Sequence, residues 1–148
     1  MSMAMTKEER EAFLADVHIA VISIPESERG PLTVPVWYAY ESGGEVRIWT
    51  GGASRKARLL QQAERFSLCV QQETQPYKYV SVEGPVLAIE PIHLERHLRP
   101  LVYRYLGPNE GERFIEQLGG SSTGTGDILI RMRPERWLSE DYSKSTSS

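Results

Sequence analysis

The strand-like segments of this chain follow one another with too few helices between them for a regular strand-helix alternation, and this order limits the possible folds. Segments rich in β-branched, aromatic or alternating apolar residues cover residues 18–24, 33–40, 45–50, 66–72, 78–89 and 127–133. Helical patterns are confined to the N-terminus and to residues 54–62, 91–106 and 110–118. A parallel sheet needs a long crossover after each strand. The order therefore predicts an antiparallel β-barrel with flanking helices, mainly β with α.

Glycine and proline residues indicate how the first strands are arranged. Gly43 and Gly44 fall between residues 33–40 and 45–50, which we expect to pair as an antiparallel hairpin. Pro35 lacks the N–H that a central strand donates. It therefore belongs at a sheet edge, at a bulge, or where the backbone faces a ligand.

The second half of the chain contains further bends and two segments of low complexity. Gly84-Pro85 predicts a bulge, and Pro100 predicts a helix kink because proline removes an internal hydrogen-bond donor. Residues 119–126 have the composition of a flexible connector, and the tail over residues 143–148 is predicted to be disordered.

Two helix starts carry N-cap signals. Thr6 followed by Glu9 has the pattern of a capping box, in which each side chain bonds to the other residue's backbone N–H. Ser54 is placed to cap the helix that follows it. Both helices should therefore begin directly after these residues.

Length, charge and cysteine content exclude several classes of protein. The chain has 148 residues, which suits one domain over residues 1–148. Its net charge of −3 gives no broad positive field, so nucleic acid and membranes are not expected as partners. The N-terminus becomes charged too early for a signal peptide, which favours the cytoplasm. Cys69 is the single cysteine, so an internal disulfide is excluded and a packed thiol is expected.

The segment over residues 49–58 has the features of an anion site. It joins the end of a strand to the start of a helix, where free backbone N–H groups and the hydroxyls of Thr50 and Ser54 can donate to a phosphate. Arg55, Lys56 and Arg58 lie in the first helical turn, where cations oppose the helix dipole unless an anion binds between them. The alternative interpretation of this charge pattern is a solvated basic helix face.

The same segment resembles the pyridoxamine 5′-phosphate oxidase-like superfamily of FMN- and deazaflavin-binding split β-barrels. In that superfamily an aromatic-Thr pair, a three-residue turn and Ser-Arg-Lys hold the cofactor phosphate, and Trp49, Thr50, Ser54, Arg55 and Lys56 match this pattern. The similarity extends from about the first helix to Leu138 and includes RKARLLQQAERFSLCV, VSVEGPV and ILIRMRPERWL. RKARLLQQ and YVSVEGPV are most similar to the deazaflavin (coenzyme F-420)-dependent reductase branch.

The resemblance implies a homodimer with the cofactor at the subunit interface. The strand containing Val34, Pro35 and Val36 would run along the ring system, and Lys78 would reach the cofactor from the partner subunit. Where the oxidase has an arginine before the ring-binding strand, this chain offers only Arg29 or Thr33. We therefore do not carry the oxidase activity over.

The resemblance also implies a redox function. Coenzyme F-420 is the expected cofactor and FMN the alternative, with Arg58, Lys78 and Arg29 as cations for the F-420 tail. Trp37, Trp49 and Tyr79 are candidates to stack on the ring or line its pocket. The expected activity is hydride transfer to or from a small unsaturated or quinone-like substrate, with no catalytic side chain assigned. A carrier that binds the cofactor without turnover and a haem-binding split barrel are the alternatives.

The histidines do not indicate a metal site. His93 and His97 are four residues apart on a predicted helix, but their spacing is not that of the HExxH zinc motif. Catalytic zinc normally has three protein ligands, and no firm third ligand follows from the sequence. We therefore predict a surface pair and no bound metal.

Overall fold

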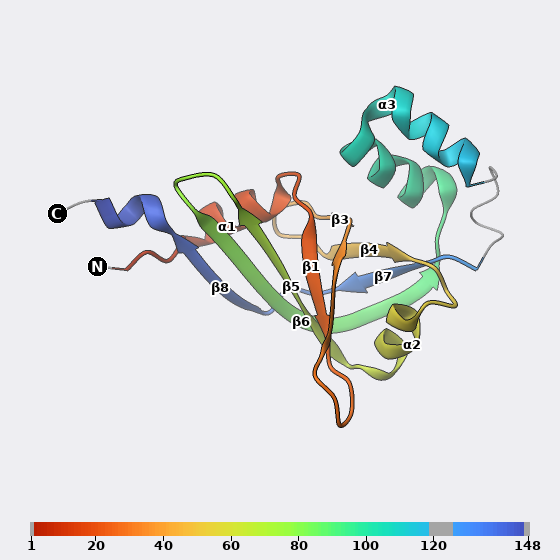
Figure 1. Ribbon diagram of the computed structural model, residues 1–148, viewed down its shortest axis with the longest axis horizontal. Coiled ribbons are helices and arrows are strands. Elements are labelled where there is room, and N and C mark those ends of the chain that lie inside the picture. Colours follow the sequence, from red (N-terminus) through yellow and green to blue (C-terminus); the bar gives the residue numbers. More distant parts are fainter. Residues whose placement is uncertain (1, 119–125, 147–148) are drawn as a thin grey trace.

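The structure, a computed structural model, describes residues 2–118 and 126–146, which form a curled antiparallel sheet with helices around it (Figure 1). The strands are β1 (Ala20–Ile24), β2 (Leu32–Val36), β3 (Tyr38–Ala39), β4 (Val46–Thr50), β5 (Arg65–Gln72), β6 (Lys78–Pro91), β7 (Ile128–Met132) and β8 (Arg136–Asp141). Their order is β2-β1-β5-β6-β7-β4-β3, and β8 pairs with β6 beside this path. The sheet forms a half-barrel, which confirms the predicted antiparallel, mainly β fold.

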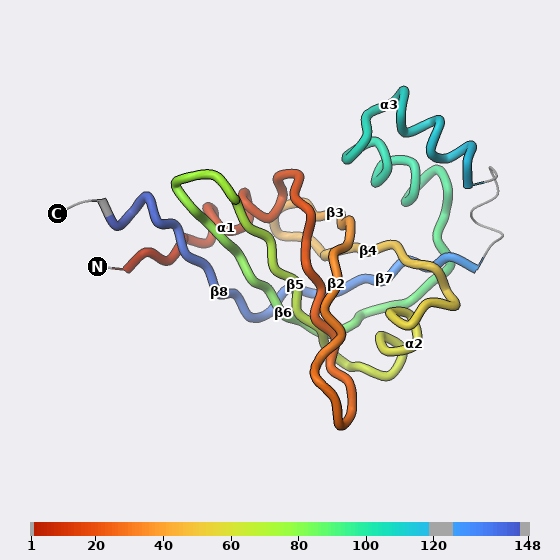
Figure 2. The backbone as a smooth tube through the Cα atoms, in the orientation of Figure 1, coloured from red at the N-terminus to blue at the C-terminus, as the bar shows by residue number. Residues whose placement is uncertain are grey.

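The long strand β6 connects the two halves of the curled sheet (Figure 2). Its residues 78–83 pair with β5 on one side and with β8 on the other. Its last part, from Val86 onward, pairs with β7. The chain therefore makes a split barrel by bending one strand through both halves.

The bend in β6 differs in detail from the predicted bulge at Gly84-Pro85. The register irregularity lies between Val86 and Ala88, opposite β7. Gly84 has another role, because a Cβ at this position would overlap the carbonyl oxygen of Arg133. Glycine is needed here for a close backbone approach.

The main core fills the inside of the curl. Ile22 of β1, Leu68 of β5 and Val82 of β6 are register partners across neighbouring strands, and all three are fully buried. Leu14 of α1 (Lys7–Ala15) is also fully buried in this core. The alternation of buried and outward side chains that the strand patterns predict is therefore present.

The segment predicted as one strand over residues 33–40 is two strands separated at Trp37. The first, β2, pairs with β1 at one edge of the sheet, where Pro35 lies opposite Val21. The second, β3, pairs with β4 at the other edge, with Tyr38 opposite Ile48. Only β3 therefore forms the predicted hairpin, whereas the edge position predicted for Pro35 is confirmed.

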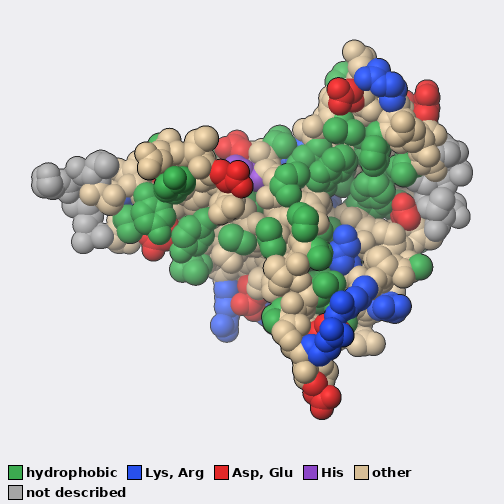
Figure 3. Space-filling model, viewed as in Figure 1, with side chains coloured by type: hydrophobic (Ala, Val, Ile, Leu, Met, Phe, Trp, Pro, Cys, Tyr) green, Lys and Arg blue, Asp and Glu red, His purple; other side chains and the backbone are tan. Residues whose placement is uncertain are grey.

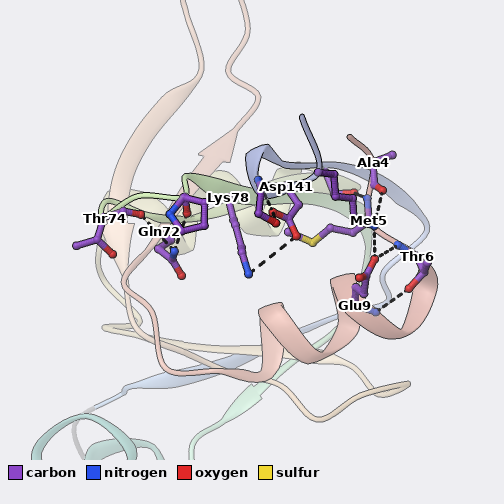
Figure 4. Close-up of polar contacts among 12 residues, drawn as sticks. Ala4, Met5, Thr6, Glu9, Gln72, Thr74, Lys78 and Asp141 are labelled. Carbon is purple, nitrogen blue, oxygen red and sulfur yellow. Dashed lines mark hydrogen bonds and ion pairs between the residues drawn. The ribbon is translucent and has the colours of Figure 1, made fainter. Parts of the chain in front are cut away.

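The first two helices begin where their caps predict. The N–H of Glu9 donates to Thr6 Oγ1 at 3.2 Å, and Glu9 Oε1 accepts from the Thr6 N–H at 2.8 Å, which completes the capping box of α1 (Figure 4). The Ser54 hydroxyl accepts from the Ala57 N–H at 3.1 Å at the start of α2 (Arg55–Gln62). Local hydrogen bonds therefore fix both helix starts.

The kink predicted at Pro100 coincides with a change of helix type. A π-helical turn, η1 (Leu94–Leu98), leads directly into α3 (Arg99–Gln117), and Pro100 lies in the first turn of α3. The helical path breaks at Gly107, whose φ is 77°, directly before Pro108 and between the two helices predicted over residues 91–106 and 110–118. Glycine adopts this conformation without steric cost, whereas proline cannot continue the preceding turn.

A second apolar cluster attaches α3 to the sheet. Val102 and Ile115 of α3 pack with Leu129 of β7, and Ile92 and Leu98 join them. In Figure 1 the two parts of α3 lie to one side of β4 and β7. Neither α3 nor another described helix combines the length and the apolar character needed to cross a bilayer.

The C-terminal region is more ordered than predicted. β8 is a strand that the sequence patterns do not predict, and it pairs with residues 78–83 of β6. A 3-10 helix, η3 (Tyr142–Thr146), follows, so the disorder predicted from residue 143 is wrong up to residue 146. Ser143 N–H donates to Asp141 Oδ1 at 2.9 Å, and Lys144 Nζ lies 2.6 Å from Glu9 Oε1. Residues 147–148 and most of the predicted connector, 119–125, lie outside the described residues.

Candidate cofactor site

A cleft opens between the end of β2, the end of β4 and the start of α2. Its volume is about 320 Å³, and it is lined by Ile19, Pro35, Val36, Trp37, Trp49 and Lys56. Small-molecule sites commonly begin at about 300 Å³. Pro35, Val36, Trp49 and Lys56 are predicted cofactor-binding residues, so the fold brings together part of the predicted site from three separate segments.

The start of α2 places hydrogen-bond donors beside the cleft. Ser54 Oγ lies 3.1 Å from Thr50 Oγ1, and because Thr50 is only 5% exposed, its hydroxyl orients Ser54 rather than facing solvent. The first N–H groups of an α-helix, here those of Arg55 and Lys56, have no acceptor within the helix. An anion at this position would accept from them and interact favourably with the helix dipole.

The turn before α2 is held against the start of β7. The Ser54 N–H donates to the Gly51 carbonyl at 3.1 Å, which closes the turn. A Cβ at Gly52 would overlap the carbonyl oxygen of Gly126. The turn therefore requires glycine at residue 52, and this close packing fixes the position of the helix start.

The three cations of α2 have different surroundings. Arg55 Nη2 lies 2.6 Å from Glu26 Oε2, so an acid in the loop after β1 neutralises it. Arg58 is exposed, whereas Lys56 lines the cleft and makes no ion pair with any residue in the described ranges. Figure 3 shows Lys and Arg side chains gathered in the region of α2. The repulsion inferred from the sequence is therefore smaller than expected, and Lys56 is the cation best placed to meet a ligand.

Glu26 also pairs with Arg29, a residue predicted to contact the tail of F-420. Arg29 Nη1 lies 3.8 Å from Glu26 Oε1, and the Glu26 side chain is only 16% exposed. Thr33, the alternative to Arg29 before the ring-binding strand, is exposed and donates to the Pro31 carbonyl at 3.3 Å. Neither residue lines the cleft.

Aromatic residues of α3 support the tryptophans that line the cleft. Trp37 stacks on Tyr105 with ring centroids 4.8 Å apart and planes 5° apart. Phe114 lies against both tryptophans, at centroid distances of 5.7 Å from Trp37 and 6.1 Å from Trp49. Trp49 Nε1 donates to Asp127 Oδ2 at 3.0 Å. The orientation of both rings is therefore set from α3 and from the start of β7.

Sequence reasoning missed the supporting residues Tyr105, Phe114 and Asp127, as well as Ile19 in the lining. Tyr105 and Phe114 lie on either side of the Gly107 break, and nothing local shows that this helix covers the sheet. Asp127 is the first residue of a predicted strand, where an acidic residue is ordinarily solvated. A contact that depends on tertiary packing leaves no periodic signal in the sequence.

The Tyr105 hydroxyl also holds the bend between β2 and β3. It accepts from the Tyr38 N–H at 3.1 Å and donates to the His18 carbonyl at 2.7 Å. Burial raises the pKa of Tyr105, which keeps the hydroxyl protonated as a donor. One side chain of α3 thus stabilises both the position of Trp37 and the strand break that creates the cleft.

We expect Tyr105→Phe to lower the free energy of unfolding by about 1 to 3 kcal/mol, because two partly buried backbone groups lose their partner. The stacking on Trp37 should persist, since the ring remains. Urea denaturation measures the change. Tyr142→Phe is the matched control at a 42%-exposed tyrosine, and an equal, small effect of both variants would contradict the anchoring role of Tyr105.

Three predicted cofactor-binding residues lie away from the cleft within one chain. Val34 packs against the main core, so its side chain does not line the cleft. Lys78 begins β6, which β5 separates from β1, and its Nζ lies 3.9 Å from Asp141 Oδ2 (Figure 4). Tyr79 follows Lys78 on β6 and is half-buried. A single chain does not bring Lys78 or Tyr79 to Lys56.

The two histidines of the predicted pair take part in local backbone hydrogen bonds. The His93 N–H donates to His97 Nδ1 at 3.0 Å, and the Arg96 N–H donates to His93 Nδ1 at 3.1 Å. Within residues 2–118 and 126–146, no group of three or more metal-binding side chains lies together. The histidine pair therefore caps the π-helical turn.

Solved structures resemble this chain over most of its length, although no family model and no curated protein matches it. A conserved hypothetical protein from Mycobacterium tuberculosis is 22% identical, with a TM-score of 0.76 over 99% of this chain and 91% of that chain. An F-420 reductase is 20% identical, with a TM-score of 0.68 over 86% and 94%. A protein from Listeria innocua, named as a candidate pyridoxamine 5′-phosphate oxidase, is 9% identical, with a TM-score of 0.64 over 89% and 95%.

Identities at this level establish the fold and leave the activity open. The similarity covers the curled sheet and its helices, which agrees with the resemblance inferred from residues 49–58. The chain therefore has the split β-barrel fold of these solved structures.

Proposed function

We propose that this chain binds coenzyme F-420, or alternatively FMN, in the cleft and acts as an oxidoreductase. The observation that carries the proposal is that Lys56 and the start of α2 meet Pro35, Trp37 and Trp49 around one cleft. A phosphate-bearing tricyclic cofactor needs an anion site next to a flat, largely apolar slot. The similarity of the fold to that of an F-420 reductase supports this ligand class.

The donor set fits such a cofactor from end to end. The phosphate would accept from Lys56 and from the first N–H groups of α2, and the ring would lie along β2. β2 is an edge strand that pairs with β1 on one side only, so its outer N–H and C=O groups are available to the polar edge of a ring. The side chain of Val34 packs in the core.

The preference for coenzyme F-420 rests on the cations around the phosphate end. F-420 carries an anionic tail beyond its phosphate, whereas FMN ends there. Arg58 is exposed on α2, and Arg29 lies in the adjacent loop and shares Glu26 with Arg55. A tail carboxylate could take the place of Glu26 on these arginines and could also pair with Arg58, which makes no ion pair with the described residues, so we prefer the longer cofactor.

The outer face of the sheet supports a homodimer. Val21, Cys69, Ser81 and Leu138 are register partners in one row across β1, β5, β6 and β8, and none is charged. Val21 is 41% and Leu138 60% exposed, and Figure 3 shows hydrophobic side chains over these strands. A second copy on this face would cover the apolar row, whereas Lys78 lies at the start of β6 on the same face as the buried Val80 and Val82.

The bound cofactor would supply the hydride, and the described residues would bind and orient it. Lys56 and the α2 N–H groups fix the phosphate, which sets the distance of the ring along β2. Trp37 and Trp49 form apolar walls that exclude water from the ring. Since Lys56 is the single titratable group among the lining residues, proton transfer would involve solvent or the substrate itself.

The composition of the cleft lining also favours one alternative function. A cleft with no second acid or base among its lining residues also suits a protein that carries or sequesters the cofactor without turnover. The two functions share the binding site and differ only in whether an acceptor reaches the ring.

The test begins with calorimetric titrations of coenzyme F-420 and FMN into the full chain. We expect micromolar or tighter binding of at least one, with F-420 tighter, and quenching of tryptophan fluorescence by the ring. The reduced complex is then mixed with quinones and other unsaturated acceptors. Oxidation faster than that of free reduced cofactor supports the enzyme, and no acceleration across the panel supports the carrier.

Two further results would contradict the proposal. Failure of both cofactors to bind would remove it, and a Soret band on adding haem, with no flavin binding, would favour a haem protein instead. Light scattering measures the mass in the same samples, and a monomer at every concentration would contradict the dimer.

A further inference from the structure

A second cavity, here called the arginine cavity, lies between the sheet and the helical arm formed by η1 and α3. Its volume is about 210 Å³, and its walls come from β3, β4, β7, η1 and α3. The residues that matter for its chemistry are Arg47, Arg96, Arg104, Glu41, Leu101 and Leu129. It shares no lining residue with the cofactor cleft, so it is a separate site.

Three arginines from different elements line this cavity. Arg47 lies on β4, Arg96 on η1 and Arg104 on α3, whereas the whole chain has a net charge of −3. Glu41 is the single carboxylate among the lining residues, and His97 adds no charge near neutral pH because burial lowers its pKa. The lining therefore has a surplus of positive charge, which is unfavourable unless an anion joins it.

Backbone carbonyls rather than a carboxylate hold Arg104 in place. Its Nη2 donates to the carbonyls of Ala15 and Asp16 at 3.1 and 2.8 Å, and its guanidinium lies 5.2 Å from the ring centroid of Tyr38. Among the described residues Arg104 makes no ion pair, so its charge is oriented but not neutralised. Because the Arg104 side chain is already held in place, an anion can bind it without the entropic cost of ordering that side chain.

The other two arginines differ in how accessible they are to a ligand. Arg47 Nη2 lies 2.6 Å from Glu41 Oε2, and Glu41 is 72% exposed, so a competing anion can displace its carboxylate from the cavity. The side chain of Arg96 is exposed and has no hydrogen-bond or ion-pair partner in the described part of the chain. Glu41 therefore occupies a position that a ligand carboxylate can take.

Apolar residues form another part of the lining. Leu101 of α3 and Leu129 of β7 are each 3% exposed, and Leu129 belongs to the apolar cluster that attaches α3 to the sheet. An inorganic ion would leave this part of the cavity without contacts. A ligand that combines an oxyanion with a small apolar body would contact both parts.

We propose that the arginine cavity binds a small organic anion, with its carboxylate or phosphate on Arg47, Arg96 and Arg104 and its apolar body on Leu101 and Leu129. Planar oxyanions suit the guanidinium fork, which donates two parallel hydrogen bonds. The proposal does not rest on cofactor binding, because the two sites have separate linings. The site thus remains testable in a chain that binds no flavin.

The first test uses benzoate and phenyl phosphate as probes, with benzamide as the neutral analogue of benzoate. Each is titrated into the nitrogen-15-labelled full chain at constant ionic strength and followed by two-dimensional NMR. We expect both anions to bind at least fivefold more tightly than benzamide, with the largest shifts at the amides of Arg47, Arg96 and Leu129. Comparing benzoate with phenyl phosphate decides which oxyanion the cavity prefers.

Two variants with opposite expected effects make the test sharper. Arg96→Gln should weaken benzoate binding at least fivefold, whereas Glu41→Gln should strengthen it at least twofold because it removes the competing carboxylate and frees Arg47. Both residues are exposed, so neither change should disturb folding. Arg113→Gln, at an exposed arginine of α3 away from the cavity, is the matched control and should leave the affinity unchanged.

Three outcomes would overturn the proposal. Equal affinity for benzoate and benzamide would show that charge does not drive binding. Equal effects of Arg96→Gln and Arg113→Gln, or weaker benzoate binding in Glu41→Gln, would rule out the assigned contacts. Shifts confined to Trp37, Trp49 and Lys56 would place the anion in the cofactor cleft instead.

Discussion

Replacing Lys56 with alanine is expected to weaken cofactor binding by about tenfold or more while the fold stays intact. A hydrogen bond to a charged group contributes about 1.5 to 3 kcal/mol, and tenfold in affinity corresponds to about 1.4 kcal/mol. Lys56 is the cation of α2 that lines the cleft, since Arg55 pairs with Glu26 and Arg58 is exposed. Calorimetric titration of coenzyme F-420 and FMN into both proteins measures the loss.

The fold of this variant can be checked by its stability. A cation in the first helical turn opposes the dipole, so its removal should leave the melting temperature unchanged or slightly higher. Lys7→Ala, at the first position of α1, makes the same chemical change in another first turn and should leave cofactor affinity unaltered. An unchanged affinity in Lys56→Ala would move the phosphate away from the start of α2.

Replacing Gly84 with alanine should destabilise the chain by about 3 kcal/mol or more, because the new Cβ would overlap the carbonyl oxygen of Arg133. The backbone cannot easily move aside, since hydrogen bonds hold it on both sides. The Arg133 N–H donates to the Pro85 carbonyl at 3.2 Å, and the Glu135 N–H donates to the Glu83 carbonyl at 2.9 Å. Urea denaturation, or the yield of folded protein, measures the effect.

The control for this prediction is Gly30→Ala. No atom lies within 4 Å of a Cβ built at Gly30, and its φ is not in the left-handed region. This variant should change the free energy of unfolding by less than about 1 kcal/mol. A Gly84→Ala protein as stable as Gly30→Ala would show that β6 and the segment after β7 are not held together as described.

Features encoded by neighbouring residues could be predicted from the sequence. Thr6 with Glu9, and Ser54 before its helix, carry their hydrogen-bond partners within three residues, so both helix starts were predictable. The edge position of Pro35 follows from its missing N–H. Residues 49–58 likewise combine strand end, turn and helix start in one continuous segment, which is why the phosphate end of the site could be proposed.

Features set by distant parts of the chain could not be predicted. The break at Trp37 depends on Tyr105 of α3, and the neutralisation of Arg55 depends on Glu26, which is 29 residues away. β8 contains four polar or charged residues in Arg136–Asp141, so its pairing with β6 outweighs a weak local pattern. The break at Gly107, by contrast, falls between the two helices predicted over residues 91–106 and 110–118.

The position of the cofactor can be determined from a crystal structure of the full chain with coenzyme F-420, or with FMN if only FMN binds. We expect the cofactor phosphate within hydrogen-bond distance of Lys56 Nζ and the first N–H groups of α2, and the ring along β2 between Trp37 and Trp49. A cofactor bound elsewhere, with Lys56 in contact only with solvent, would contradict this expectation.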